Sequence, residues 1–133
     1  MAGETDLGRL LHTLKPRLLP QDYVFCCLKH PTLEQILGLK PLATFRENEG
    51  MTLVLEREQA LQQQFEFDGI LKCITLSVHS SLQAVGLTAA VASALAENHI
   101  SANVIAAFYH DHVFVPSQHA QRALTVLENL PAV

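Results

Sequence analysis

The stretch Ile74–Pro116 constrains the fold of this chain more than any other part. It opens with Ile74, Leu76 and Val78, which alternate with polar residues. This period of two predicts a strand with one buried face. After a turn of small and polar residues, the alanine-rich run Ala84–Asn98 has apolar residues at helical spacing. A strand that passes through a tight turn into a helix is therefore the first expected unit of structure.

The second half of this stretch predicts a hairpin. Residues Ser101–Pro116 are rich in Val, Ile, Phe and Tyr and are interrupted by His110-Asp111-His112, which we expect to form the hairpin turn. Strand, helix and hairpin together make a βαββ unit. The helix has one apolar stripe of small residues and a second one beside it, so we expect two covered faces, one of them facing a partner or the N-terminal helix: Val85, Ala89, Ala92 and Ala96 form the first stripe, and Leu87, Val91 and Leu95 the second.

Composition excludes several classes of protein. The chain has 133 residues, of which 49% are hydrophobic and 17% charged, so it can build a packed core as one domain or two very small ones. A net charge of −4 with scattered Lys and Arg argues against nucleic-acid binding. No apolar run is long enough for a membrane span, and the N-terminus lacks the pattern of a signal peptide. We therefore expect a cytoplasmic protein with reduced cysteines, of which the adjacent Cys26 and Cys27 point to opposite faces of a strand.

The rest of the chain predicts short elements. We expect His30–Pro41, which holds two prolines and a glycine, to be a loop with at most one helical turn. Ser117 is the expected cap of the last helix. We also expect helices over Leu7–Leu14 and Arg57–Phe65. The final helix should bury a stripe of apolar residues, namely Ala120, Ala123, Leu124, Leu127 and Leu130. The expected strands are Tyr23–Leu28 and the pair Ala43–Glu47 and Met51–Glu56, which flank a turn at Gly50.

A weak internal repeat divides the chain. Leu53-Val54-Leu55 corresponds to Val113-Phe114-Val115, and the elements around both triplets follow in the same order. We infer two βαββα-like units, 1–68 and 69–133. The first has too little chain between its first strand and its hairpin for a long crossover helix, so we expect a degenerate unit whose open face is covered by the helix Leu7–Leu14.

The turn before the alanine-rich helix is the candidate binding site. The start of a helix presents unpaired N–H groups and a partial positive charge, which suit a carboxylate. Gly86 allows the backbone to come close to a ligand, and Ser80, Ser81 and Gln83 supply polar groups. Asn103, early in the next strand, could face the same turn. A plain helix cap and a polar strand start are the alternative interpretations of these residues.

The histidines suggest a different chemistry. His110 and His112, with Asp111 and with His79 from a neighbouring strand, could bind zinc or iron. However, the triplet lies at an expected turn, where Asp is common, and the chain has neither an HExxH nor a CxxC motif. We therefore predict no metal site, no cofactor and no catalytic residue.

Three segments carry a resemblance to a known family. SSLQAVGLTAA, YHDHVFVP and, less specifically, EGMTLVL resemble small bacterial proteins with two tandem ACT domains, which are related to the ACT units of aspartate kinases. The resemblance implies an α+β, ferredoxin-like (βαββαβ-type) fold with antiparallel sheets and helices on one face. It also implies regulatory binding of amino acids, side-by-side pairing of units, and a ligand at the turn from the first strand into the first helix. Val85 departs from the family, in which proline is common at that position.

The expected function is that of a non-catalytic sensor, a homodimeric regulator that binds an amino acid or a similar small metabolite. The alternatives are a structural or interaction module whose pocket is vestigial, and a metal-dependent enzyme that uses the histidines. The expected ligand-binding residues are those of the turn together with the polar residue of the next strand: His79, Ser80, Ser81, Leu82, Gln83, Ala84, Val85, Gly86, Leu87 and Asn103.

Overall fold

The computed structural model describes residues 6–8, 11, 14–77 and 85–130, and it divides into two compact units. Unit 1 consists of Met1–Pro20 and Lys72–Val133, and unit 2 of Gln21–Leu71. Strand β1 (Pro16–Leu28) contributes residues to both units, and the hydrogen-bonded strand order is β2-β3-β1-β4-β6-β5. The strand predicted at Tyr23–Leu28 is thus present, and it begins earlier than predicted, at Pro16.

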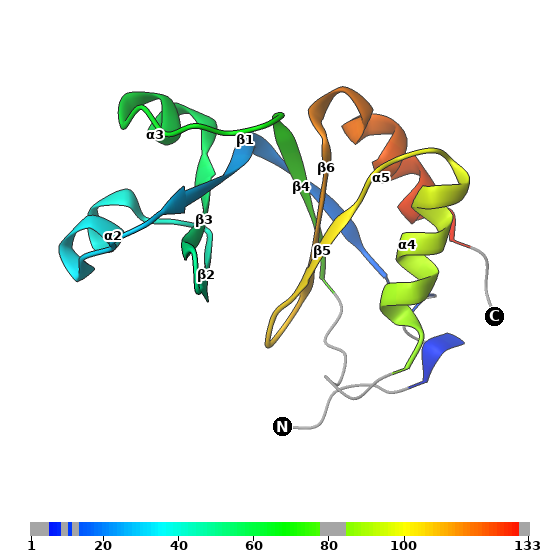
Figure 1. The fold of residues 1–133 in the computed structure, drawn as a ribbon. Coiled ribbons are helices and arrows are strands. Elements are labelled where there is room, and N and C mark those ends of the chain that lie inside the picture. Colours follow the sequence, from blue (N-terminus) through cyan, green and yellow to red (C-terminus); the bar gives the residue numbers. More distant parts are fainter. Residues whose placement is uncertain (1–5, 9–10, 12–13, 78–84, 131–133) are drawn as a thin grey trace. The chain divides into compact units, whose positions relative to one another are not determined.

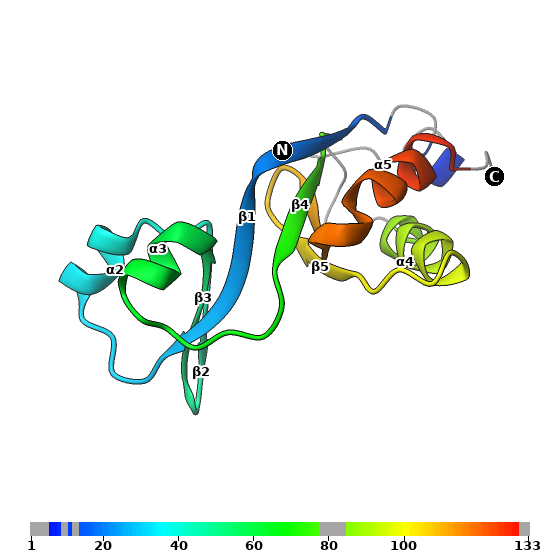
Figure 2. The same ribbon diagram turned by 90° about the horizontal axis from the view of Figure 1, so that it is seen from above.

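Unit 1 follows the order expected for a βαββα unit. It contains β4 (Leu71–Leu76), α4 (Leu87–Glu97), β5 (Asn103–Ala106), β6 (Asp111–Pro116) and α5 (Ala120–Glu128), with a 3₁₀ turn, η1 (Ser117–His119), before α5. Helices α4 and α5 lie side by side on one face of the strands (Figures 1 and 2). In the N-terminal helix predicted over Leu7–Leu14, residues 7, 8 and 11 are helical. Residues 9, 10, 12 and 13 of this range lie outside the described residues.

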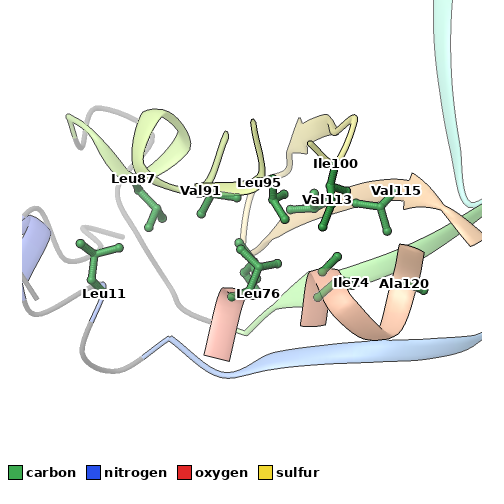
Figure 3. Packing of buried hydrophobic residues seen from close by; sticks show 12 residues of the cluster. Leu11, Ile74, Leu76, Leu87, Val91, Leu95, Ile100, Val113, Val115 and Ala120 are labelled. Atoms are coloured by element: carbon green, nitrogen blue, oxygen red, sulfur yellow. The ribbon is translucent and has the colours of Figure 1, made fainter. Parts of the chain in front are cut away.

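The core of unit 1 shows which face of α4 is buried. Leu87, Val91 and Leu95 are buried against residues of β4 and β6 (Figure 3). Within the single chain the alanine stripe is not a buried face: Ala89 and Ala96 are exposed, Ala92 is half-buried, and Val85 is 83% exposed and precedes the helix. The leucine face of α4 is the buried one because each leucine removes far more apolar area from water than an alanine does. The alanines instead suit a solvent-facing helix surface, since alanine has the highest helix propensity.

Strand β4 is buried on both faces rather than on one. Ile74 and Leu76 belong to the core beneath the helices, as predicted. The alternating residues Cys73 and Thr75 point to the opposite face, yet they are only 0% and 5% exposed. Val78, the third residue of the predicted pattern, lies outside the described residues. The expectation of one solvated face is therefore wrong for this strand.

The hairpin turn lies earlier in the chain than predicted. The Ala107 N–H donates a hydrogen bond to the His110 carbonyl at 3.0 Å, and β6 begins at Asp111. Asp111 and His112 are thus strand residues, while the exposed Phe108 and Tyr109 occupy the turn. The reason is register: pairing of β5 with β6 places Val113 and Val115 in the core, and the strand must continue back to Asp111 to pair with Ala106.

The last helix has the predicted face and a different start. Ala120, Ala123 and Leu127 are buried, and Leu124 and Leu130 are partly buried, which confirms the stripe. Ser117 does not cap α5, because it is the first residue of the 3₁₀ turn η1 and His119 is the N-cap of α5. In the described residues no side chain caps the start of α5 by a hydrogen bond.

Unit 2 contains a short helix that the sequence did not predict. Its elements are β1, α2 (Leu33–Leu39), β2 (Ala43–Glu47), β3 (Gly50–Glu56) and α3 (Arg57–Gln62), and α2 and α3 lie side by side (Figures 1 and 2). Helix α2 spans seven residues where we expected a loop with at most one turn, so this unit has its own crossover helix. The cause is a capping box formed by Thr32 and Gln35, which stabilises the first turn in spite of the flanking prolines.

The hairpin of unit 2 matches the prediction closely. β2 and β3 pair antiparallel around Gly50, whose φ is 150°. A Cβ on Gly50 would lie 2.7 Å from the Cys27 Sγ atom, so only glycine fits there. Cys27 is exposed and Cys26 is buried in the core of this unit, as the opposite-face argument predicted. Across the described part of the chain, no helix is long and apolar enough to cross a membrane.

Candidate functional site

The structure describes part of the predicted ligand site. Val85, Gly86, Leu87 and Asn103 have defined positions. The other predicted residues, His79, Ser80, Ser81, Leu82, Gln83 and Ala84, lie outside the described residues. The described part of the site therefore consists of the first turn of α4 and the strands beside it.

Gly86 is the N-cap of α4 and has a backbone conformation that favours glycine. Its φ and ψ are 101° and −17°, in the left-handed region, where a side chain would be strained. A Cβ at this position would also lie 2.9 Å from the Leu7 Cδ2 atom. The backbone conformation thus favours glycine here, while the Leu7 side-chain tip would only have to shift, and one consequence is that the N-cap has no side chain.

The missing side chain leaves the first turn of α4 open. The first hydrogen bond of the helix runs from the Ala90 N–H to the Gly86 carbonyl at 2.8 Å. The N–H groups of Leu87, Thr88 and Ala89 precede that bond, so they have no carbonyl within the helix. The N-cap residue cannot accept from them as Ser, Thr or Asp would. Thr88 and Ala89 are exposed while the Leu87 side chain is buried, so the described residues leave this turn accessible from solvent.

The corresponding helix of unit 2 is closed by its own side chains. The Gln35 N–H donates to the Thr32 Oγ1 atom at 3.2 Å, and the Thr32 N–H donates to the Gln35 Oε1 atom at 3.0 Å. These two bonds satisfy backbone donors that a ligand would otherwise use. The two units therefore differ at the position where each first helix begins.

Asn103 lies in an edge strand, opposite Phe114 on β6, and its side chain is exposed. Within the described ranges, no hydrogen bond joins Asn103 to Val85, Gly86 or Leu87. The structure thus brings Gly86 and Leu87 together with Leu7, a residue that sequence reasoning missed as a neighbour. The helical spacing of Leu7 and Leu11 predicted an apolar face on the N-terminal helix. It did not predict that Leu7 contacts the start of α4.

The histidine triplet lies where the hairpin turn passes into β6, with His110 in the turn and Asp111 and His112 on the strand. His112 shares a hydrogen bond with Thr75 of β4, at 3.0 Å between Nδ1 and Oγ1. Burial raises the pKa of the Asp111 carboxyl above its usual value, against the opposing attraction of His112 and His110. Burial also lowers the pKa of His112, so its neutral form is favoured. Sequence reasoning missed the Thr75–His112 pair because Thr75 was assigned to a solvated face.

This cluster does not resemble a metal centre. In the part of the chain that the structure describes, no group of three His, Cys, Asp or Glu side chains is placed to hold a metal ion. His79, which completed the proposed ligand set, lies outside that part. The buried His110 Nδ1 atom has no hydrogen-bond partner among the described residues.

Comparison with known proteins decides the family. Two family models, each described as an ACT domain, match residues 2–72 and 70–129. The chain belongs to the ACT-domain family. It carries two ACT domains in tandem, with the ferredoxin-like α+β fold, which confirms the resemblance drawn from the sequence motifs.

Solved structures support the same assignment. The chain is 53% identical to a Vibrio cholerae protein of unknown function, described as a possible transport protein, over 92% of this chain and 93% of that one, with a TM-score of 0.83. A protein from Agrobacterium tumefaciens has 21% identity over 88% of both chains and a TM-score of 0.72. The ligand-free regulatory subunit of aspartate kinase from Thermus thermophilus has 10% identity over 91% of this chain and 98% of that one, with a TM-score of 0.66, which shows a shared fold. No curated protein matches the chain.

Proposed function

We propose that this tandem ACT-domain protein is a non-catalytic regulator that binds an amino acid or a similar small metabolite at the start of α4. Membership of the ACT family supports a regulatory, small-molecule-binding role. The observation that carries the proposal is the first turn after Gly86, which no side chain of the described residues caps. In this arrangement the carboxylate of the ligand accepts hydrogen bonds from the N–H groups of that turn.

The energetics favour a charged acceptor at this position. The dipole of a helix is worth about 0.3–1 kcal/mol to an anion near its N-terminus at an exposed site. A hydrogen bond to a charged group adds about 1.5–3 kcal/mol. Ser80, Ser81 and Gln83 of the preceding turn are the residues that we propose for the remaining polar groups of the ligand, with His79 beside them.

We also propose that the protein forms a homodimer. β2 and β5 stand at the two ends of the strand order, so each has an edge with no neighbouring strand from the described residues. Exposed edges of this kind are ready to pair with a second chain. Light scattering of the purified full chain tests this: a mass of twice 14.7 kDa supports the dimer, and a monomer at the highest usable concentration contradicts it.

One observation favours an interaction module as a second candidate function. Helix α2 buries none of its residues, and Leu33 and Leu37, four positions apart on it, are 73% and 66% exposed. Phe45 on β2 is 71% exposed. Apolar side chains gathered on one unit are typical of a surface that contacts a partner.

Thermal unfolding of the full chain with each of the standard amino acids separates the two functions. A ligand that binds the native state at about 100 times its Kd stabilises it by about 2.7 kcal/mol, which raises Tm by roughly 5–10 °C. No shift with any amino acid or related carboxylate would leave the interaction module as the better explanation.

A matched pair of variants locates the site. Thr88 is exposed in the first turn of α4, so Thr88→Asp places a carboxylate where the ligand's would sit. The new charge stabilises the helix start by about 0.3–1 kcal/mol, and it repels the ligand. We expect Tm without ligand to rise slightly and the ligand-induced shift to disappear, whereas Thr88→Asn keeps most of that shift. An undiminished ligand response in Thr88→Asp would remove the start of α4 from the site.

A further inference from the structure

A second cavity lies in unit 2, beside α2 from its first turn onward and away from the start of α4. It is a groove of about 250 Å³ between α2 and α3, just below the roughly 300–1,000 Å³ of sites for drug-sized ligands. Its lining combines an apolar floor with polar side chains above it: Leu28, Leu39 and Phe65 form the floor, and Glu34, Gln35, Gly38, Gln59 and Gln63 complete the walls.

Gly38 is the residue that most needs an explanation. It lies inside α2, one position before the last residue of the helix, where glycine is less favourable than alanine. Neither packing nor backbone geometry demands it, because a Cβ there would meet no atom within 4 Å and the residue is not among those with positive φ. What the glycine does is leave open the part of the groove that it lines.

The end of the same helix breaks a second local preference. Lys40, which ends α2, adopts the left-handed conformation with φ 49° and ψ 56°. Glycine is the residue that favours this position, and in this chain it stands two residues earlier, inside the helix. Proteins depart from such local preferences mainly at functional sites, where another requirement outweighs stability.

The lining residues define the chemistry of an occupant. Glu34 is the one charged side chain among the residues that line the groove, and no ion pair engages it in the described part of the chain. The Gln35 Oε1 atom already accepts from Thr32, which leaves its amide nitrogen as a donor, and Gln59 and Gln63 supply further amides. The floor is made of two leucines and a phenylalanine.

We propose that this groove binds a small cationic amine with an apolar body. The ammonium group pairs with the Glu34 carboxylate, the glutamine amides bond to polar atoms of the ligand, and the apolar part packs on Leu39 and Phe65. The site is separate from the proposed carboxylate site of unit 1, so one can fail while the other stands.

The larger groove of unit 1 lacks these features. It has a volume of about 480 Å³ between α4 and α5. Apart from Glu97, its polar side chains already bond to the protein: Asn98, Thr125 and Asn129 donate to helix carbonyls, and Arg122 contacts the Asn98 carbonyl and the His119 ring. No residue in it departs from local preference as Gly38 does.

The test uses the full chain, 2-phenylethylamine as the probe and 2-phenylethanol as its neutral counterpart of the same shape. Titration followed by ¹H–¹⁵N NMR should move the backbone signals of Gly38 and Gln63 with the amine, and the alcohol should need a concentration about two- to fivefold higher to move them as far. Glu34→Gln should weaken amine binding by about two- to fivefold, as expected for an exposed ion pair. Equal binding of the amine and the alcohol, or no movement of these signals, would overturn the proposal.

Gly38→Ala separates stability from binding. The methyl group should raise Tm by about 2–4 °C, because it improves helix propensity and meets no atom of the protein. The same group enters the groove, so amine affinity should fall by about tenfold. The matched control is Lys40→Gly, which also stabilises α2 but lies outside the lining, and it should retain amine binding. If Gly38→Ala binds the amine as tightly as the parent does, the groove is not the site.

Discussion

Leu95→Ala tests which face of α4 builds the core of unit 1. Leu95 is 0% exposed and packs in the cluster between α4 and the strands (Figure 3). Truncation removes buried methyl groups and leaves a cavity, since backbone elements on both sides can close only part of it. Leu→Ala changes at such positions destabilise by about 3–5 kcal/mol, against a total stability of roughly 5–15 kcal/mol for a domain.

Urea unfolding followed by circular dichroism measures this loss. With a slope of roughly 2 kcal/mol per molar urea, the midpoint should fall by about 2 M while the slope stays unchanged. The control is Ala96→Gln on the exposed face of the same helix, which should change stability by no more than about 0.5 kcal/mol. If Ala96→Gln destabilises as much as Leu95→Ala does, the alanine stripe is buried after all and the leucine face alone does not build the core.

Two further predictions concern a cap and a buried carboxyl. Thr32→Ala removes the capping box of α2 and should destabilise unit 2 by about 1 kcal/mol, whereas Thr32→Ser should keep most of the stability; equal melting of both variants would contradict the role of the box. Burial raises the pKa of Asp111, so the unfolded chain releases this proton first as pH rises above about 3.8, and ionisation then favours unfolding. Asp111→Asn should therefore be more stable than the parent at pH 7, with the difference shrinking below that pKa, and a larger stabilisation at pH 3 than at pH 7 would contradict this sign.

The sequence predicts elements well where side-chain size and periodicity agree. β2 was predicted at its observed bounds because the turn at Gly50 sets the register of both strands. The stripe of α5 was also predicted, since its apolar residues have one consistent spacing. On α4, alanines and leucines gave two competing stripes, and only the larger area of the leucines decided between them.

The wrong predictions have two causes: tertiary contacts outweighed a local signal at the histidine triplet, and a local cap was overlooked at α2. His110-Asp111-His112 has the composition of a turn, yet Asp111 and His112 extend β6 because the strand pairs with β5 and His112 bonds to Thr75. The prolines flanking α2 suggested a loop, yet the Thr32 capping box sustains seven helical residues between them. In the candidate site, Gly86 could be singled out from its place before a helix, but the contact of Leu7 with it depends on packing that no local pattern contains.

The backbone N–H groups at the start of the first helix are capped in unit 2 and uncapped by Gly86 in unit 1. This difference predicts how many carboxylate ligands each chain binds. In unit 2 a ligand carboxylate would have to displace the two hydrogen bonds between Thr32 and Gln35, at a cost of about 1–3 kcal/mol in total. In unit 1 the N-cap Gly86 makes no such bond, so nothing from that residue must be displaced. The same carboxylate ligand should therefore prefer the start of α4 by roughly 5- to 150-fold. Calorimetric titration should then give one tight site per chain, and Thr32→Ala should add a second, weaker one; two equivalent sites in the parent chain would show that the open turn after Gly86 is not what selects the ligand.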